Sequence, residues 1–489
     1  MARDDARATL PWIGVAPDAP YFVDEAGASW TPIGQNDAID WVEFKTLYGR
    51  RDVASVERHL EYLAAHGVTC LRFMLEYAHK DHRYFERRAG TPWPAMVRLW
   101  DDLFAMCERI GLRILLTPVD TFWMWVRWAR HPWNRVHGGP LEHPSQLLTC
   151  PDTRRAIKAR LEFMVRRWGG SGALFAWDLW NEIHPAQGGD SADMFPEFIA
   201  DLSQHVRSLE FELYGRSHPQ TVSLFGPELW WKPEMPLAEP IFRHPDLDFA
   251  TIHIYRSGAI DDPKDTVAPA VAMGKVVRDC LREITDTRPF LDTEHGPIHR
   301  FKDKRRTLPA AFDDEYFRHM SWAHLASGGA GGGMRWPNRK PHTLTHGMRK
   351  AQRAMAGFLP LIDWARFARV NISEAVEATG LNVFACGDDR QAVVYLLRRR
   401  ALGADGRVDP AVEPREVRVT VPGLADGRYR VTGWDTTEGC VVEDLTAEAS
   451  GGALRFTSRA IGADRAFAIS TQVDLARLGE AAGDTHFAR

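Results

Sequence analysis

The strongest constraint on the fold of this chain is a repeated alternation between short apolar runs and longer amphipathic segments. Buried parallel strands are continuous apolar runs, and a sheet of such strands needs helices on its faces. The pattern predicts eight strands, over residues 31–35, 68–75, 112–119, 173–180, 221–226, 249–255, 288–293 and 331–336. It predicts helices over residues 52–66, 96–110, 153–168, 194–214, 267–284, 314–326 and 344–361.

The first predicted helix shows the spacing on which these assignments depend. Val53, Val56, Leu60 and Leu63 fall on one helical face, and Gly67 follows as a stop. A succession of eight strands alternating with helices predicts an α/β fold of the (β/α)8 TIM barrel type. The number of residues from one strand to the next varies too much for a solenoid of regular repeats. A doubly wound sheet would have a glycine-rich phosphate-binding turn after an early strand, and the sequence has none.

The pattern changes after about residue 370, where short alternating runs are separated by turn sequences such as GDDR, ADGR and ASGG. Runs of this kind predict a small antiparallel β-sandwich. We therefore expect a barrel with an N-terminal extension over residues 1–368, a sandwich over 369–475 and a loose tail over 476–489.

The charge balance excludes several classes of partner. Lys and Arg total 61 against 65 Asp and Glu, a net charge of -4, so no basic field attracts a nucleic acid or an acidic membrane surface. No apolar stretch reaches the roughly 18 residues of a membrane span, and the N-terminal sequence lacks the basic and apolar regions of a secretory signal. The expected location is the cytoplasm, with the six scattered cysteines reduced.

The chemistry of a TIM barrel lies at the carboxyl ends of its strands. Polar and aromatic side chains lie in or just after most of the predicted strands at this end: Arg72 and Glu76 for the second, Asp120 for the third, Asn181 and Glu182 for the fourth, His253 and Tyr255 for the sixth, Glu294 for the seventh, and Arg335 and Trp336 for the eighth. The fourth and seventh strands lie on opposite sides of the barrel mouth. Glu182 and Glu294 can therefore face each other across a bound sugar ring.

A facing pair of carboxyl groups is what hydrolysis of a glycosidic bond requires. A protonated acid gives its proton to the leaving oxygen and a carboxylate attacks the anomeric carbon, and retaining enzymes hold the two groups about 5–5.5 Å apart. The environments of the pair must separate their pKa values. Arg72 and Tyr255 are expected to keep Glu294 ionised, and Asn181 is placed to bond the sugar hydroxyl beside the reacting carbon.

A family resemblance supports this chemistry. WNE after the fourth strand, HxY in the sixth, Glu after the seventh and Trp after the eighth resemble clan A glycoside hydrolases, most closely family 5, the cellulase and mannanase group. The resemblance covers roughly residues 20–365. It implies a β-linked substrate, retention of configuration, Glu182 as acid/base and Glu294 as nucleophile. It also implies a sugar-binding shell of Arg72, Asn181, His253, Tyr255 and Trp336.

Three departures from the family pattern lie beside the expected sugar site. Many members carry a histidine at the end of the third strand, where this chain has Asp120 and is more similar to the mannan-active branches. The usual NEP reads NEIHP here, with Ile183 and His184 inserted, and His295 follows Glu294 in place of an apolar or aromatic residue. These changes concern the identity of the sugar. The expected substrate is a gluco- or manno-configured β-linked oligosaccharide or glycoside.

Further side chains are candidates for sugar contacts. Glu76 and Asp120 are expected to accept hydrogen bonds from hydroxyl groups. The loop over residues 121–139 contains four Trp residues; one or two of them, Trp123 included, are expected to stack on sugar, and the others to form a small core within the loop. The same two interpretations apply to Trp230 and Trp231.

No cofactor and no metal are expected. The histidines lack the spacing of metal ligands, and the GGAGGG run at 328–333 lacks the Lys-Ser/Thr of a phosphate loop. A metal-dependent hydrolase would need several strand-end ligands, and only His253 is suitably placed. Two alternatives to a hydrolase stay open. One is a transglycosidase that passes the sugar to an acceptor, and the other is a non-catalytic carbohydrate-binding barrel whose carboxylates are structural.

Overall fold

The predicted apolar runs form one parallel barrel sheet in the computed structural model, which describes residues 10–77, 84–298 and 307–471. In spatial order its strands are β10 (Gln220–Thr221), β9 (Leu174–Asp178), β8 (Arg113–Thr117), β5 (Cys70–Met74), β4 (Gly34–Asp37), β13 (Met334–Arg335), β12 (Phe290–His295) and β11 (Ala250–Ile254). A bridge between Phe225 and His253 joins the two edges of this sheet, so the barrel closes. The predicted TIM barrel is confirmed.

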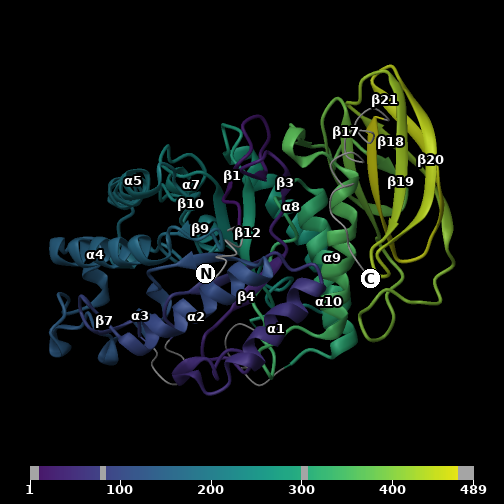
Figure 1. Ribbon diagram of the computed structural model, residues 1–489. Helices are drawn as coiled ribbons and strands as arrows, with labels where there is room; N and C mark the ends of the chain where they lie inside the picture. The colour runs from purple at the N-terminus through teal and green to yellow at the C-terminus, as the bar shows by residue number, and fades with distance from the viewer. Residues whose placement is uncertain (1–9, 78–83, 299–306, 472–489) are drawn as a thin grey trace, which may run out of the picture.

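The long helices of the described residues surround this barrel (Figure 1). Asp52 caps the first of them by accepting a hydrogen bond from Ser55 N at 3.0 Å, and Gly111 and Gly215 end the second and fourth in the left-handed conformation. The long helices are α1 (Val53–Ala65), α2 (Pro94–Ile110), α4 (Pro151–Trp168), α5 (Phe195–Tyr214), α8 (Ala268–Glu283), α9 (Ala310–Ala326) and α10 (His346–Phe358). Short helices are α3 (Thr121–Val126), α6 (Glu228–Trp231) and α7 (Ala238–Phe242).

Two strands are much shorter than predicted. The fifth was expected over 221–226, but its regular ladder ends at Thr221. The eighth was expected over 331–336 and covers only β13, because Gly331 and Gly333 before it have φ values of 109° and 73°. A side chain at Gly333 would place its Cβ 3.0 Å from an Asp292 oxygen. Glycine therefore lets the chain approach the neighbouring strand closely, but the positive φ values interrupt the extended backbone that a strand needs.

The N-terminal extension contains a small antiparallel sheet that the sequence pattern did not predict. Its strands are β1 (Ile13–Val15), β2 (Phe22–Asp24) and β3 (Ser29–Trp30). The Phe22 ring lies 4.9 Å from that of Phe175 and 5.5 Å from that of Phe249, centroid to centroid. Both partners lie at the amino-terminal ends of barrel strands, so this sheet covers the end of the barrel opposite the site. A further hairpin pairs β6 (Glu86–Arg88) with β7 (Thr91–Pro92).

The C-terminal strands form the predicted antiparallel sandwich, whose two layers belong to one curled sheet. In spatial order the strands are β14 (Val370–Asn371), β16 (Leu381–Gly387), β17 (Gln391–Arg398), β22 (Asp464–Thr471), β19 (Gly427–Asp435), β20 (Cys440–Ser450), β21 (Ala453–Ile461), β18 (Arg415–Pro422) and β15 (Glu377–Ala378). Val394, Val419 and Ile469 pack in the core between the layers. The division at residue 368 stays a prediction, and the expected tail at 476–489 lies outside the described residues.

The sandwich packs against the barrel through α9 and α10 (Figure 1). Trp322 of α9 stacks on Tyr395 of β17 at a centroid distance of 6.1 Å, and Trp434 Nε1 donates a hydrogen bond to Ala354 O of α10 at 3.0 Å. Every aromatic side chain in the described strands of the sandwich is buried: Phe384, Tyr395, Tyr429, Trp434, Phe456 and Phe467. The sandwich strands therefore present no aromatic surface on which a sugar could stack.

All six cysteines are free thiols. No helix in the described part of the chain combines the length and the apolar character that crossing a bilayer requires.

Candidate active site

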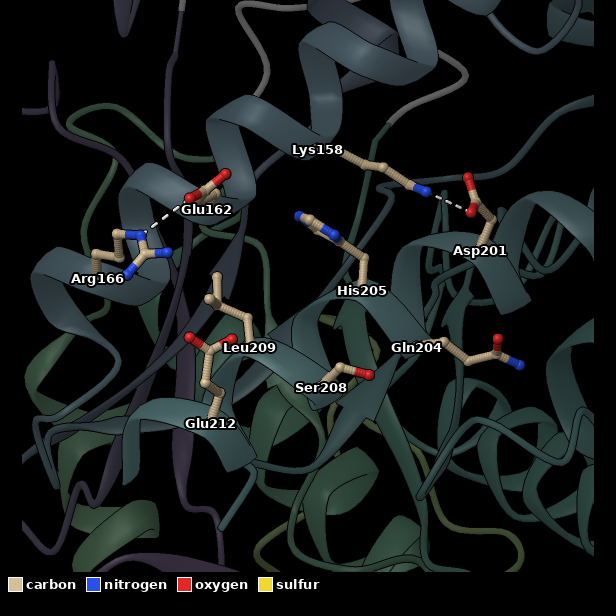
Figure 2. Close-up of a pocket in the computed structure, with 9 residues that line it drawn as sticks. All are labelled: Lys158, Glu162, Arg166, Asp201, Gln204, His205, Ser208, Leu209 and Glu212. Carbon is tan, nitrogen blue, oxygen red and sulfur yellow. Dashed lines mark hydrogen bonds and ion pairs between the residues drawn. The ribbon is translucent and has the colours of Figure 1, made fainter. Parts of the chain in front are cut away.

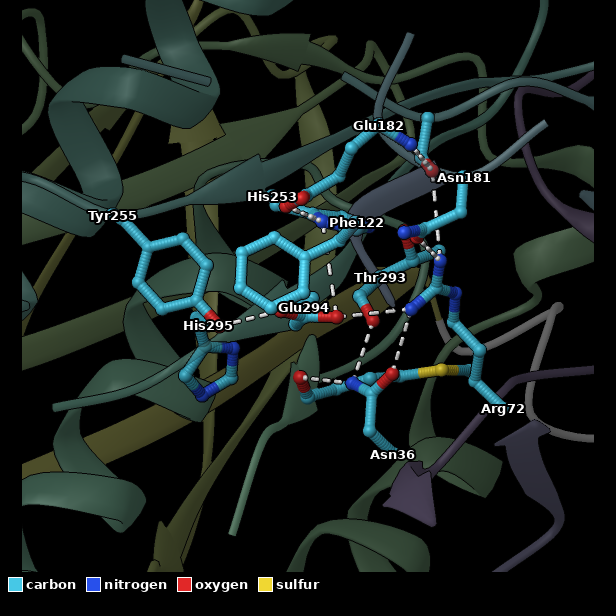
Figure 3. Close-up of polar contacts among 12 residues, drawn as sticks. Asn36, Arg72, Phe122, Asn181, Glu182, His253, Tyr255, Thr293, Glu294 and His295 are labelled. Atoms are coloured by element: carbon cyan, nitrogen blue, oxygen red, sulfur yellow. Dashed lines mark hydrogen bonds and ion pairs between the residues drawn. The ribbon is translucent and has the colours of Figure 1, made fainter. Parts of the chain in front are cut away.

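A buried arginine lies at the centre of the strand ends. Arg72, the third residue of β5, is 1% exposed, and its guanidinium donates five close hydrogen bonds to four side chains. Nη1 donates to Glu294 Oε2 at 3.0 Å and Nη2 to Asp178 Oδ2 at 2.7 Å. The remaining acceptors are the side-chain oxygens of Asn36 and Asn181. Figure 3 shows Arg72 between Asn36, Asn181 and Glu294, so one cation organises several strands.

Glu182 reaches the site from a strained turn directly after β9. Its φ is 48°, in the left-handed region that is uncommon for any residue except glycine. The strain is held by Ser223 Oγ, which accepts a hydrogen bond from Glu182 N at 3.1 Å. Its carboxylate oxygen Oε1 lies 2.7 Å from His253 Nδ1. Strain of this kind collects at functional sites, where the surrounding structure fixes one side chain in an otherwise costly position.

Glu294 lies at the end of β12 and faces Glu182. Tyr255 OH donates to Glu294 Oε1 at 2.7 Å, and Arg72 occupies Oε2. One oxygen of Glu182, one oxygen of Glu294 and one His253 nitrogen all lie within 4.8 Å of one another. The side chains of the two glutamates are 18% and 10% exposed, so both groups are largely removed from water but still reachable.

Burial raises the pKa of Glu182 to about 7, and the charges of Asp178 and Glu228 act in the same direction against Arg72. Burial also raises the pKa of Glu294, and the neighbouring charge of Glu182 adds to this effect. Arg72 and Tyr255 oppose the rise, as expected, but do not outweigh burial. These two contacts therefore favour the ionised form of Glu294 and limit the rise in its pKa.

His253 is completely buried, and burial lowers its pKa to about 4. The imidazole is therefore neutral at neutral pH and carries one proton. With that proton on Nδ1, His253 donates to Glu182 Oε1, and the carboxyl proton of Glu182 is left to Oε2. The ring thereby orients the acid without adding charge to the site.

The cluster of Glu182, His253 and Glu294 has the donor atoms of a possible metal site. Its chemistry does not favour one, because Arg72 already supplies a positive charge 3.0 Å from Glu294. A divalent cation would have to sit beside that guanidinium. The arrangement fits a pair of carboxyl groups served by a fixed arginine better than a metal centre.

Asn181 and Asp120 form the next contacts outward. Asn181 Nδ2 donates to Asp120 Oδ1 at 3.1 Å, and the same oxygen caps α3 by accepting from Phe122 N at 3.0 Å. Burial and the charge of Glu182 raise the pKa of Asp120 to about 8. Its second oxygen, Oδ2, is buried and has no hydrogen-bond partner among the described residues. A buried oxygen without a partner beside a carboxylate pair is suited to a substrate hydroxyl.

The aromatic candidates Trp123 and Trp336 lie on one side of this network. Trp336 N donates to His295 O at 2.7 Å, which fixes the residue beside Glu294. The Trp123 ring contacts that of Tyr77 at a centroid distance of 5.2 Å, and Tyr77 also contacts Trp336 at 6.1 Å. Both Trp side chains are partly exposed, so their rings are available to a ligand.

Glu76 does not belong to this network, contrary to the expectation that it contacts sugar. Its Oε1 accepts from Arg160 Nη1 at 3.1 Å and its Oε2 from Phe85 N at 2.7 Å. Arg160 also binds Glu86 Oε1 at 2.8 Å, and with His131 it lowers the pKa of Glu76 to about 2 against the effect of burial. Both oxygens are thus engaged in a buried ion cluster that anchors the loops around β6.

The Trp residues of the loop over residues 121–139 divide between buried and exposed positions. Trp133 is fully buried, and its Nε1 donates to Glu86 Oε2 at 2.8 Å, in the cluster around Arg160. Trp125 is 40% exposed. After the fifth strand, Trp231 is 62% exposed while Trp230 is half-buried under the Arg256 guanidinium.

Sequence reasoning missed three contributors to the site. Asn36 of β4 orients Arg72, and its Nδ2 donates to the backbone oxygen of Thr293 at 2.8 Å. Ser223 holds the Glu182 turn. Tyr77 joins the aromatic side of the site. The polar run GQND, which is the whole of β4, was the available signal for Asn36.

A separate surface hollow of about 460 Å³ lies between α4 and α5 on the outside of the barrel (Figure 2). Its charges largely neutralise one another, since Lys158 pairs with Asp201 and Arg166 with Glu162. It has no link to the strand ends, and we assign no chemistry to it.

Several solved structures with a similar architecture are glycoside hydrolases. One described only as a glycoside hydrolase has a TM-score of 0.59 at 13% identity, covering 96% of this chain and 99% of its own. A family 5 glycoside hydrolase from Bacteroides vulgatus ATCC 8482 has a TM-score of 0.61 at 12% identity, covering 96% of each chain. The endo-β-1,4-mannanase of Thermotoga petrophila has a TM-score of 0.50 at 15% identity over 88% of this chain and 91% of its own.

These similarities define the class at the level of fold: a family 5-like barrel followed by an antiparallel sheet domain. The resemblance indicated by the strand-end motifs is thereby confirmed for the architecture. No protein-family model matches the sequence. A search of curated protein sequences gives no significant match.

Proposed function

We propose that the protein is a retaining β-glycoside hydrolase that acts on gluco- or manno-configured β-linked oligosaccharides or glycosides. The observation that carries this proposal is the pair Glu182 and Glu294, with oxygens within 4.8 Å of each other and different partners. Retaining enzymes hold their carboxyl groups about 5–5.5 Å apart, whereas inverting enzymes leave about 6.5–9.5 Å for a water molecule. The close spacing supports direct attack by one carboxylate.

In the first step Glu294 attacks the anomeric carbon and forms a covalent glycosyl ester. The bond from that carbon to the leaving oxygen breaks, and Glu182 gives its proton to this oxygen. A pKa of about 7 suits Glu182 to this role, because the group is protonated below neutral pH and can also release its proton there. Arg72 and Tyr255 stabilise the ionised form of Glu294 before attack.

In the second step the roles reverse. Glu182, now ionised, takes a proton from a water molecule, and the resulting hydroxide attacks the anomeric carbon. The ester bond to Glu294 breaks, and the sugar leaves with its original configuration. His253 remains neutral and holds Glu182 in place through both steps.

The substrate class rests on the site and on the similar structures together. Asn181 and Asp120 supply hydrogen-bonding groups beside the pair, and Trp336 and Trp123 supply faces for sugar C–H groups. The similar solved structures include the Thermotoga petrophila endo-β-1,4-mannanase and a Rhizomucor miehei mannosidase in complex with mannosyl-fructose, with a TM-score of 0.50. These support a manno-configured sugar as the first to try.

The test is hydrolysis of a panel of aryl β-glycosides and β-linked oligosaccharides by the wild type, Glu294→Ala and Glu182→Ala. We expect one sugar to be turned over, both variants to lose nearly all activity on it, and azide to restore Glu294→Ala partly with release of the α-glycosyl azide. Glu76→Gln is the control variant, because Glu76 lies in a separate ion cluster. If this variant folds, it should hydrolyse the same sugar without added azide.

Two outcomes would overturn the proposal. If both site variants keep the wild-type activity, the pair is structural and the chemistry lies elsewhere. If the wild type binds sugars but turns over none of the panel, the protein is a carbohydrate-binding barrel. Product analysis with excess sugar acceptor separates hydrolysis from transglycosylation, since only the latter lengthens the acceptor.

A further inference from the structure

Four aromatic side chains contact one another along one side of the catalytic pair. Trp41 follows β4, Tyr77 follows β5, Trp123 follows β8, and Trp336 follows β13, and these four strands are consecutive in the barrel. The centroid distances are 5.2 Å for Trp123–Tyr77, 5.8 Å for Tyr77–Trp41, 5.1 Å for Trp41–Trp336 and 6.1 Å for Tyr77–Trp336. We call these four residues the aromatic wall.

The contact distances indicate that the wall has no gap. Rings whose centroids lie about 4.5–7 Å apart touch directly, so a sugar ring cannot pass between them. Trp41 and Tyr77, at the middle of the wall, are 4% and 3% exposed. The ring of His342 stacks on Trp41 at 5.0 Å with an interplanar angle of 15°, which supports the wall further.

The wall occupies one of the two arcs between the catalytic strands. Glu182 follows β9, and Glu294 lies at the end of β12. Going around the barrel in one direction from β9 to β12, one passes the four strands that carry the wall, β8, β5, β4 and β13. In the other direction one passes only β10 and β11. The segment after β10 carries Trp231, whose exposed ring lies 5.9 Å from that of Phe225. Phe225 in turn contacts Tyr255 at 5.6 Å, so aromatic rings line this arc too. However, Trp231 is 62% exposed, where Trp41 and Tyr77 are buried. We call this arc, over β10 and β11, the open side.

The direction of the substrate follows from the role of each carboxyl group. Glu182 protonates the leaving oxygen, so the leaving portion lies on its side of the pair. Its neighbours there are Glu228 and His184, whose side chains lie 3.5 Å apart after β10 and β9. The sugar that reacts lies over Glu294 and next to Trp336, which is joined to the backbone beside Glu294. The far end of that sugar therefore meets the aromatic wall.

We propose that the enzyme removes single sugar units from the non-reducing end of its substrate, because the aromatic wall leaves room for one sugar on the glycone side of the catalytic pair. This inference rests on the proposed hydrolase function and adds its mode of action. Asp120 follows β8, one of the four strands that carry the wall, and its Oδ2 has no hydrogen-bond partner among the described residues. It is the group offered to a hydroxyl of that terminal sugar. A terminal unit thus fills the glycone pocket, and the rest of the chain leaves over β10 and β11.

The test uses the wild type and the sugar found on the panel, as a β-linked tetrasaccharide tagged at its reducing end. Early products should be free monosaccharide and tagged trisaccharide. The same tetrasaccharide with its non-reducing end capped by an O-methyl group should not be cleaved. Trp41→Ala opens the wall and should release untagged disaccharide as well, whereas the control Trp231→Ala, on the open side, should give the wild-type product pattern.

The outcomes separate this inference from the function on which it rests. Untagged disaccharide or trisaccharide as a first product of the wild type, or cleavage of the capped substrate, overturns the exo mode while the hydrolase function stands. No cleavage of any panel glycoside overturns the hydrolase function and the exo mode together. The capped substrate decides the mode even if Trp41→Ala does not fold.

Discussion

Replacement of Arg72 by methionine tests whether the arginine controls the ionisation of the catalytic pair. Methionine keeps much of the apolar volume and removes the charge. The guanidinium now lies 3.0 Å from Glu294 and 2.7 Å from Asp178 and lowers the pKa of Glu294 against the effect of burial. Without it the pKa of Glu294 rises. Glu294 must be ionised to attack, so activity at the acidic side of the pH profile falls.

The magnitude follows from the geometry. At 3.0 Å and an effective dielectric constant of about 20, the attraction between Arg72 and Glu294 is about 5.5 kcal/mol as an upper bound. Water entering the vacated space reduces the loss, and an opposite charge at this range typically moves a carboxyl pKa by roughly 1–3. We therefore expect the acidic limb of kcat/KM to move upward by roughly 1–3 pH units. Leaving Asp178 buried without its partner also costs about 3–5 kcal/mol of stability.

The assay is the pH dependence of kcat/KM for an activated aryl glycoside, with thermal melting of each protein at the same pH values. Arg160→Met is the matched control, because Arg160 is also buried and paired with two carboxylates, Glu76 and Glu86, outside the site. It should lower the melting temperature similarly and leave the acidic limb in place. An Arg72→Met profile with an unmoved acidic limb would refute the electrostatic role and reduce Arg72 to a structural residue.

Three further predictions follow from other parts of the structure. Glu182→Gln should abolish the fall in kcat/KM that the wild type shows above about pH 7, since wild-type activity falls as the pH rises through the pKa of Glu182. The pH dependence of kcat/KM for an activated aryl glycoside measures this. Dialysis against a chelator should leave kcat unchanged, and a loss that added Zn²⁺ or Mn²⁺ restores would contradict the expectation that no metal takes part. Trp434→Ala should lower the free energy of unfolding by about 3–5 kcal/mol, because it removes the buried ring that contacts Ala354 of α10. Denaturant unfolding measures this loss, and the control Trp231→Ala, at an exposed position, should lower the free energy of unfolding far less.

The barrel could be predicted from the sequence because each strand and helix carries its own local signal. Apolar runs, helical spacing and caps such as Asp52 all point to the same architecture. The short elements could not be predicted in this way. The strands β1 to β3 have only two or three residues each, and the eighth strand is shortened by the backbone geometry of Gly331 and Gly333. These features depend on packing against distant parts of the chain.

The catalytic candidates could be predicted to the extent that strand topology decides them. Glu182, Glu294, His253 and Tyr255 lie in or just after strands whose ends must meet, and the structure brings them close together through hydrogen bonds. Their electrostatics could not be predicted in full. Arg72 and Tyr255 favour the ionised form of Glu294, as expected, but burial raises its pKa. The effect of burial could not be predicted, because the degree of solvent exclusion depends on the whole mouth of the barrel.

Glu76 and Arg72 show most clearly what only the three-dimensional structure decides. Both lie in or just after the same strand, and each is paired with a buried partner of opposite charge. By sequence, Glu76 is as good a strand-end carboxylate as Glu294. Both groups accept hydrogen bonds at both oxygens, from Arg160 and a backbone amide for Glu76 and from Arg72 and Tyr255 for Glu294. The difference is that Glu294 also faces the carboxyl group of Glu182, with oxygens within 4.8 Å. A carboxylate that holds an ion cluster together stabilises the fold, whereas one that faces a second carboxyl group at the strand ends is available for chemistry.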